Sequence, residues 1–250
     1  MAPKTVLITG ASSGIGAALA RSYARAGVTL LLWGRDEARL NQTAAQCRAL
    51  GAAATIQAFD LRDAAGFAAR LAAADTATPI DLAIFNAGLG GTVPDGAFAE
   101  APQTAQAIAE VNFVAPVTGA SAIADAMARR GTGHIVLVGS ISESFPLPMA
   151  PTYAATKAGL RMFAESLDIR MTQYGVKVTL VSPGFIDTPM SQKVTEPKPF
   201  LMDADTAAGI ITRRIAAGAR TIVVPWQFAV IRAVAGLLPR GLLRLILARA

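Results

Sequence analysis

The sequence predicts a single α/β domain with a doubly wound, parallel seven-stranded sheet flanked by helices. Short apolar runs alternate with longer helical patterns along the chain, which is typical of repeated strand–helix units. The length of 250 residues suits one domain. Hydrophobic residues make up 53% of the chain and charged residues 16%, so there is enough apolar material for a large core.

Seven apolar runs are the expected strands, at residues 5–9, 29–33, 55–58, 82–85, 134–138, 177–181 and 221–224. Helical patterns fill the gaps, and the longest cover residues 103–129 and 152–174. Since strand–helix–strand crossovers are right-handed, the expected strand order is 3-2-1-4-5-6-7. We expect residues 1–225 to form this domain and residues 226–250 to be its helical C-terminal extension.

Charge and cysteine content narrow the possible partners. The formal net charge is +6, and no acidic residue follows Asp205, whereas seven arginines do: Arg213, Arg214, Arg220, Arg232, Arg240, Arg244 and Arg249. Without a recognised motif or a dense Lys/Arg run, this excess does not indicate nucleic-acid binding. Cys47 is the only cysteine, so an internal disulfide and a cysteine-based metal cluster are excluded, and no metal is expected. The N-terminus leads directly into the first strand, which favours a cytoplasmic protein over a secreted one.

A glycine-rich turn joins the first strand to a helical pattern at residues 17–26. Gly10, Gly14 and Gly16 are spaced four and two residues apart in Thr-Gly-Ala-Ser-Ser-Gly-Ile-Gly. Glycines at a strand-to-helix turn let the backbone approach a dinucleotide pyrophosphate, and the helix N-terminus favours the anion. The alternative is a turn that serves packing only. The expected contacts from this turn are Gly10, Ser12, Ser13, Gly14, Ile15 and Gly16.

Tyr153 and Lys157 are four residues apart in Tyr-Ala-Ala-Thr-Lys. On a helix they share one face, where an ammonium favours the phenolate and lowers the tyrosine pKa from its ordinary value near ~10. The pair alone is weak evidence for a catalytic site, because this spacing also occurs on an ordinary helix face. A serine upstream, Ser140, follows the expected strand 134–138. A Ser-His-acid triad is excluded, since the only histidine, His134, lies at the opposite end of that strand.

Together these motifs resemble the short-chain dehydrogenase/reductase family over roughly residues 4–190. The glycine turn, Asn-Ala-Gly at 86–88, Asn112, Ser140, the Tyr-x-x-x-Lys pair and Pro-Gly at 183–184 follow in the family's order. The resemblance implies a Rossmann-type, NAD(P)-dependent oxidoreductase. In it Ser140 would orient a carbonyl oxygen, Tyr153 would exchange the proton, Lys157 would bind the nicotinamide ribose, and Asn112 would hold a relay water.

Two of these roles have alternatives. Ser142 could take the place of Ser140, although it is better suited to shaping the pocket. Asn112 could merely cap a kink beside Pro116.

The resemblance also implies the remaining cofactor contacts. Asp60 and Leu61 would meet the adenine, although Asp60 could instead cap the helix that begins near Asp63. The residues expected to line the rest of the cofactor are Asn86, Ala87, Gly88, Pro183, Gly184, Ile186 and Thr188, with Tyr153 and Lys157. Phe85 replaces the first of two asparagines that the family usually carries.

The end of the second expected strand bears on the choice between NADP and NAD. Gly34 stands where NAD-preferring relatives carry an acid, and Arg35 follows it. A guanidinium binds a phosphate in bidentate fashion, so NADP(H) is preferred and NAD(H) stays possible. Ser13 could add a hydroxyl contact. Asp36 could instead hold Arg35 in a surface ion pair.

The sequence indicates less about the substrate and about the contacts of the C-terminal end. Apolar side chains in the expected pocket favour a lipophilic ketone, aldehyde or alcohol: Phe145, Leu147, Met149, Phe185 and Met190. Residues 226–250 are too interrupted to span a membrane, and they could pack on their own domain, on a second subunit or at a membrane surface. The family implies a homodimer or homotetramer. The alternative functions are an NAD-dependent alcohol dehydrogenase of the same family and a non-catalytic dinucleotide-binding sensor or scaffold.

Overall fold

The computed structural model describes residues 2–195, 197–238 and 241. Its centre is a seven-stranded sheet in the order β3-β2-β1-β4-β5-β6-β9, in which every neighbouring pair is parallel. The strands are β1 (Thr5–Thr9), β2 (Thr29–Gly34), β3 (Ala53–Ala58), β4 (Leu82–Phe85), β5 (Gly133–Val138), β6 (Val176–Pro183) and β9 (Thr221–Val224). The predicted fold class and strand order are confirmed, with β9 as the seventh strand.

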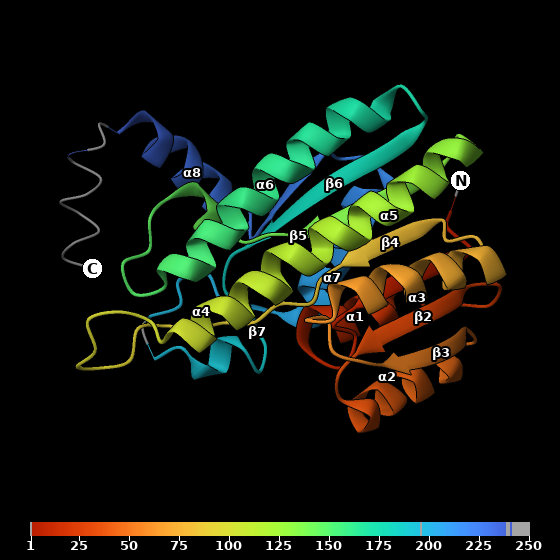
Figure 1. Cartoon of the computed structure of the whole chain (residues 1–250), viewed down its shortest axis with the longest axis horizontal. Coiled ribbons are helices and arrows are strands. Elements are labelled where there is room, and N and C mark those ends of the chain that lie inside the picture. Colours follow the sequence, from red (N-terminus) through yellow and green to blue (C-terminus); the bar gives the residue numbers. More distant parts are fainter. Residues whose placement is uncertain (1, 196, 239–240, 242–250) are drawn as a thin grey trace.

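Helices cover both faces of this sheet (Figure 1). One layer holds α3 (Ala64–Ala77), α5 (Ala115–Arg130) and α6 (Pro151–Thr172), and the other holds α1 (Gly14–Tyr23), α2 (Glu37–Ala49) and α7 (Ala204–Ala216). In β1, Val6 and Ile8 belong to one core cluster and Leu7 to the other, since successive strand side chains point to opposite faces. Burial on both faces explains why the strands are continuous apolar runs in the sequence.

The helix predicted over residues 103–129 contains a wider turn. α4 (Pro102–Ala109) leads into a π-helical segment at Glu110–Val114, which continues as α5. Pro116 has no N–H, and in an α-helix its ring would clash with the carbonyl of Asn112 four residues earlier. The chain widens instead, with the N–H of Ala115 bonded to the carbonyl oxygen of Glu110. Asn112 therefore lies inside the π segment.

The remaining elements mostly follow the carboxyl ends of strands. They are the short 3₁₀ helices η2 (Ile141–Ser144) and η3 (Ser191–Lys193), the two-stranded parallel pair β7 (Ile186–Asp187) and β8 (Met202–Asp203), and the helix α8 (Gln227–Leu237). The helix predicted over residues 152–174 is α6, and the one predicted over 17–26 is α1, which begins at Gly14 within the glycine turn.

Candidate active site

The glycine-rich turn between β1 and α1 has the shape of an anion site. Gly10 has a φ of +68°, and a Cβ on it would lie 2.8 Å from the Cα of Ala87. A Cβ on Gly16 would lie 2.2 Å from the carbonyl oxygen of Gly10. Ser13, the N-cap of α1, makes no side-chain hydrogen bond to the helix, so its hydroxyl and the first-turn N–H groups can meet a phosphate. These residues fit a dinucleotide pyrophosphate; Ser12, Gly14 and Ile15 complete the turn.

Asn86 braces this turn from the end of β4. Its Nδ2 donates to the carbonyl oxygen of Thr9 at 3.1 Å. The backbone N–H groups of Asn86 and Ala87 both donate to Thr9 Oγ1, at 3.0 and 3.1 Å. The side chain of Asn86 thus holds the glycine turn against β4, and the expected contact of Asn86 with the cofactor stays a prediction.

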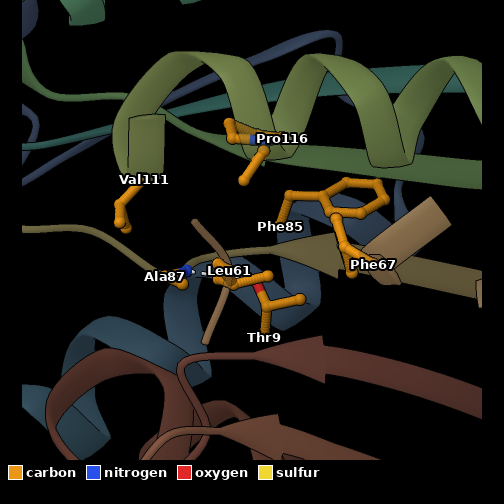
Figure 2. Close-up of a pocket in the computed structure, with 8 residues that line it drawn as sticks. Thr9, Leu61, Phe67, Phe85, Ala87, Val111 and Pro116 are labelled. Atoms are coloured by element: carbon orange, nitrogen blue, oxygen red, sulfur yellow. Dashed lines mark hydrogen bonds between the residues drawn. The ribbon is translucent and has the colours of Figure 1, made fainter. Parts of the chain in front are cut away.

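An apolar pocket opens beside the glycine turn at the ends of β1 and β4 (Figure 2). Figure 2 shows Leu61 and Ala87 between Val111 and Thr9, with Phe67, Phe85 and Pro116 forming the rest of the wall. Leu61, which was expected at the adenine, and Ala87, which was expected to line the rest of the cofactor, thus lie together. Phe85 packs edge-on against Phe67, with the ring centroids 6.2 Å apart, so the substituted residue is part of the core.

Asp60 is bonded to Arg62, two residues later in the chain. Its Oδ2 accepts bonds from Arg62 Nε and Nη2 at 2.9 and 2.6 Å, and its Oδ1 accepts one from the N–H of Arg62. These bonds hold the pKa of the Asp60 carboxyl below its usual range. The helix-cap alternative for Asp60 is wrong, because Asp63 caps α3 by accepting from the N–H of Gly66 at 2.9 Å.

Arg35 is exposed directly after β2. Asp36 does not pair with it; Asp36 caps α2 and lies 3.2 Å from Nε of Arg39. Within the described part of the chain no ion pair includes Arg35, so its guanidinium is open to a phosphate. Next to the glycine turn lies a polar cleft of about 310 Å³ whose lining includes Ser12, Ser13, Arg21, Arg39 and Thr188.

The four residues expected to be catalytic come from three elements. Ser140 is the N-cap of η2, Tyr153 and Lys157 lie on the first turns of α6, and Asn112 lies in the π segment. A Cβ on Gly88, at the end of the Asn-Ala-Gly turn, would lie 3.4 Å from Asn112 Oδ1 and 3.8 Å from Lys157 Nζ. The ends of β4 and β5 therefore bring these side chains into one site.

Asn112 and Lys157 are both buried and both bonded to the backbone of these turns. Oδ1 of Asn112 accepts from the N–H of Leu89 at 2.7 Å, and its Nδ2 donates to the Leu89 carbonyl at 2.9 Å. Nζ of Lys157 donates to the carbonyl oxygen of Val138 at 2.9 Å. Asn112 thus fixes the loop after the Asn-Ala-Gly turn, a role different from capping a kink at Pro116.

The loop after β6 meets the glycine turn. Pro183 ends β6, and the N–H of Gly184 donates to the carbonyl oxygen of Val224 at 2.8 Å. Ile186 is buried in β7. A Cβ on Gly14 would lie 3.0 Å from Cγ2 of Thr188, so the two loops enclose the same space.

Comparison with known proteins assigns the family. A family model described as "short chain dehydrogenase" matches residues 4–199. The chain belongs to the short-chain dehydrogenase family. It is 33% identical to an "Uncharacterized oxidoreductase" of Myxococcus xanthus (strain DK1622), with 97% of this chain and 95% of that protein covered. It is 35% identical to the "Dehydrogenase/reductase SDR family member 7B" of Bos taurus, with 82% and 65% covered.

Solved structures of short-chain dehydrogenases are similar along nearly the whole chain. A short-chain dehydrogenase from Sphingobium yanoikuyae in complex with NADPH has a TM-score of 0.81 at 27% identity and covers 94% of this chain and 96% of its own. The bulky-bulky ketone specific alcohol dehydrogenase from Comamonas testosteroni has a TM-score of 0.78 at 27% identity, with 96% of each chain covered. This protein is therefore an oxidoreductase of the family, with a nicotinamide dinucleotide as cofactor.

In this short-chain dehydrogenase the pKa of Tyr153 is raised, opposite to the lowering expected from the sequence. Burial raises the pKa of the Tyr153 hydroxyl, the neighbouring Ser140 side chain lowers it, and the charge of Glu143 raises it. Burial also lowers the pKa of Lys157 to about 8. Nζ of Lys157 lies 5.8 Å from the centroid of the Tyr153 ring, over its face. In the protein alone, burial is the largest cause of the shift in the tyrosine pKa, and it acts against the lowering that was expected from the ammonium.

Sequence reasoning missed two charged residues of this site. Arg39 lines the cleft beside Ser13, but no motif in the sequence indicates it, because Arg35 lies outside the helix α2 that carries Arg39. Glu143, in η2 after Ser140, is buried. Its position three residues after Ser140 fits a capping box, in which the glutamate bonds back to the serine N–H.

Proposed function

We propose that the protein is an NADP(H)-dependent oxidoreductase that interconverts a ketone or aldehyde and an alcohol, with Tyr153 as the acid and base. The observation that carries this proposal is the convergence of Asn112, Ser140, Tyr153 and Lys157 at the ends of β4 and β5, next to the glycine turn. A protein that only senses or binds a dinucleotide needs the glycine turn but not this group of side chains.

Each side chain of the site has its own role in the proposed reaction. The nicotinamide supplies or accepts the hydride when it is bound. The hydroxyl of Ser140 hydrogen-bonds the substrate oxygen, and Tyr153 donates the proton in reduction and accepts it in oxidation. Lys157, with its pKa of about 8, is mostly protonated at pH ~7 and can bind ribose hydroxyls while favouring the phenolate. Asn112 lies beside Lys157, where a relay water would be held.

NADP(H) is the proposed cofactor, with NAD(H) as the alternative. Gly34 leaves no acid at the end of β2, and Arg35 is exposed there without an ion pair among the described residues. Besides the NADPH complex from Sphingobium yanoikuyae, a metagenomic short-chain oxidoreductase in complex with NADP is 28% identical, with a TM-score of 0.75. The remaining proposed contacts are Ser12, Asp60, Leu61, Pro183, Gly184, Ile186 and Thr188.

A lipophilic substrate is supported by the apolar side chains near the site. Phe185 and Phe200 both contact Phe228 of α8 edge-on, with ring centroids 6.1 and 5.8 Å apart. Met149 and Met190 are exposed, at 37% and 40%. The neighbour from Comamonas testosteroni is described as specific for bulky-bulky ketones, which agrees with such a pocket.

The test of this function is a panel of carbonyl and alcohol substrates, each assayed by reduced-nicotinamide absorbance with NADPH or NADH, or with their oxidised forms. We expect turnover of apolar ketones or aldehydes, faster with NADPH. Turnover that is faster with NADH would favour the NAD-dependent alternative. Cofactor binding without any turnover would favour the sensor.

We further propose a cytoplasmic homodimer or homotetramer in which residues 226–250 extend the same domain. Phe228 is buried against that domain, whereas Trp226, Val230 and Leu237 are 69%, 52% and 86% exposed. Those exposed side chains support contact with a membrane surface; residues 239–240 and 242–250 lie outside the described residues. Pro102–Arg130 is long and apolar enough to span a membrane, but its most apolar window is 50% buried, as in a core helix. Light scattering of the wild type tests the oligomeric state. Liposome flotation of the wild type and of Trp226→Glu tests the membrane contact.

A further inference from the structure

Glu143 is a fully buried acidic side chain next to the proposed catalytic serine. Its side chain is 0% exposed, and it lies in η2 beneath the end of β5. Removing a carboxylate from water is costly unless hydrogen bonds and an opposite charge compensate for the lost hydration. The partners of Glu143 therefore indicate why this carboxylate is there.

Three elements supply those partners. Oε1 of Glu143 accepts a hydrogen bond from Oγ of Ser182 at 2.6 Å, and Oε2 accepts one from the backbone N–H of Ser140 at 3.3 Å. Nη1 of Arg232 lies 3.6 Å from Oε1. The distance of 2.6 Å between Oγ and Oε1 lies in the range of charge-assisted hydrogen bonds. One carboxylate thus joins the turn of Ser140, the end of β6 and helix α8.

The two serines that bond Glu143 both lie next to proposed active-site residues. Ser182 directly precedes Pro183 and Gly184, two of the proposed cofactor contacts. Ser140 is held from two sides, because its N–H donates to Glu143 and its Oγ accepts from the N–H of Ser142 at 3.2 Å. A displaced Glu143 would therefore move Ser140 relative to the loop that begins at Pro183.

The charged and titratable groups around Glu143 come from α6 and α8. Burial raises the pKa of the Glu143 carboxyl, while the bonds from Ser182 and Ser140 and the charges of Arg161 and Arg232 lower it. Its negative charge in turn raises the pKa of Tyr153 and of Lys157. The carboxylate therefore acts on the proton-exchanging residues through charge as well as on the serine through geometry.

We propose that Glu143 is a positioning residue of the active site and that Arg232 compensates its charge, so that the docking of α8 sets both the orientation of Ser140 and the electrostatic field at Tyr153 and Lys157. This inference rests on the proposed function for its meaning in catalysis. The coupling itself is a property of the protein and can be measured without a substrate. α8 has a second anchor in the buried Phe228, so we expect the helix to stay in place when the ion pair is altered.

The test is a pH titration of Lys157 by NMR in the full-length protein. The chain has five lysines, so ¹³Cε labelling gives few signals, and the Lys157 signal is identified by its loss in Lys157→Arg. Wild type is expected to titrate near the pKa of about 8. Glu143→Gln should lower this pKa by about one unit, because a nearby negative charge is removed. Arg232→Met should raise it, because the carboxylate loses its cation, and Arg232→Lys should restore the wild-type value.

The decisive comparison is a double variant. If Arg232 acts through Glu143, Arg232→Met has no effect on Lys157 in the Glu143→Gln background. The matched control is Arg129→Met, which breaks an exposed ion pair with Asp125 on α5 and should leave Lys157 unchanged. A Lys157 pKa that Glu143→Gln leaves unchanged, or an Arg232→Met shift of equal size in both backgrounds, overturns the proposal.

Kinetics extend the test to the proposed reaction. Glu143→Gln should lower kcat roughly tenfold with little change in KM for the cofactor, since it disturbs the proton and carbonyl sites and not the glycine turn. If Glu143→Gln does not fold, Arg232→Met and Arg232→Lys carry the test, because Arg232 is 29% exposed: a rise in the Lys157 pKa that the lysine reverses supports the proposal, and no rise overturns it. A wild type without turnover on any substrate contradicts the proposed function, whereas the NMR titration still decides the coupling.

Discussion

The cofactor-binding half, residues 5–88, and the C-terminal part, residues 183–238, are built in different ways. In the cofactor half the critical contacts are backbone contacts, such as the approach of Gly16 to the Gly10 carbonyl. In the C-terminal part they are side-chain contacts, such as Phe228 against Phe185 and Arg232 against Glu143. Close backbone approach permits only glycine and so leaves a spacing in the sequence, whereas side-chain packing can be achieved by many combinations.

Tyr153 stands where the two parts meet, and its replacement should have the largest effect. Tyr153→Phe removes the proton-exchanging hydroxyl, so we expect kcat to fall by about 10²–10⁴-fold while the dinucleotide still binds. Steady-state kinetics and a cofactor fluorescence titration measure the two quantities. Tyr174→Phe, at an exposed position, is the control and should keep full activity. Unchanged turnover in Tyr153→Phe would remove the proposed acid and base.

Gly16→Ala tests the backbone-built half. The added Cβ would lie 2.2 Å from the Gly10 carbonyl oxygen and must displace the glycine turn. We expect a loss of about 1–3 kcal/mol in the free energy of unfolding, together with weaker dinucleotide binding. Gly236→Ala, in α8 with open space around it, is the matched control and should be neutral or slightly stabilising. Denaturant unfolding and cofactor titration compare the two; equal outcomes would mean that the turn tolerates a side chain.

Arg35→Gln sharpens the cofactor assignment within the same half. Loss of a charge-assisted bond to the 2′-phosphate should weaken NADPH binding roughly tenfold. NADH binding should be unaffected, because NADH lacks that phosphate. Isothermal titration with both cofactors gives the ratio. Arg129→Met, far from the cleft, should change neither affinity, and an equal loss for NADPH and NADH in Arg35→Gln would exclude a phosphate contact.

The smallest effect concerns His134, at the end of β5 away from the active site. Burial lowers its pKa to about 4, and it bonds Oγ1 of Thr179 through Nε2 at 2.8 Å. Below the ordinary histidine pKa of about 6.5 the unfolded chain binds a proton that the folded protein excludes, so stability falls as the pH drops toward 4. Between pH ~7 and ~5.5 the loss should be about 1 kcal/mol.

Urea unfolding at these two pH values measures this loss. His134→Gln should reduce the dependence on pH; an unchanged slope in the variant would assign it to other groups.

The topology and the four motif residues could be predicted from the sequence because each has a local cause. Apolar runs specify buried strands, right-handed crossovers restrict their order, and Tyr153 and Lys157 share a face on any helix. Less of the local chemistry could be predicted. The π turn at Asn112 relieves the clash of Pro116, but the same proline could instead have kinked or ended the helix. The choice of Asp63 over Asp60 as the α3 cap depends on where that helix begins.

The fold class, the strand order and the glycine turn follow from the sequence alone, since periodicity and glycine spacing act over a few residues. The raised pKa of the buried Tyr153 and the contact of Glu143 with Arg232, which is 89 positions later in the chain, appear only in the folded protein. Burial and long-range pairing follow from how the layers pack. No local pattern of residues records that packing, because many side-chain combinations produce the same sheet and helices.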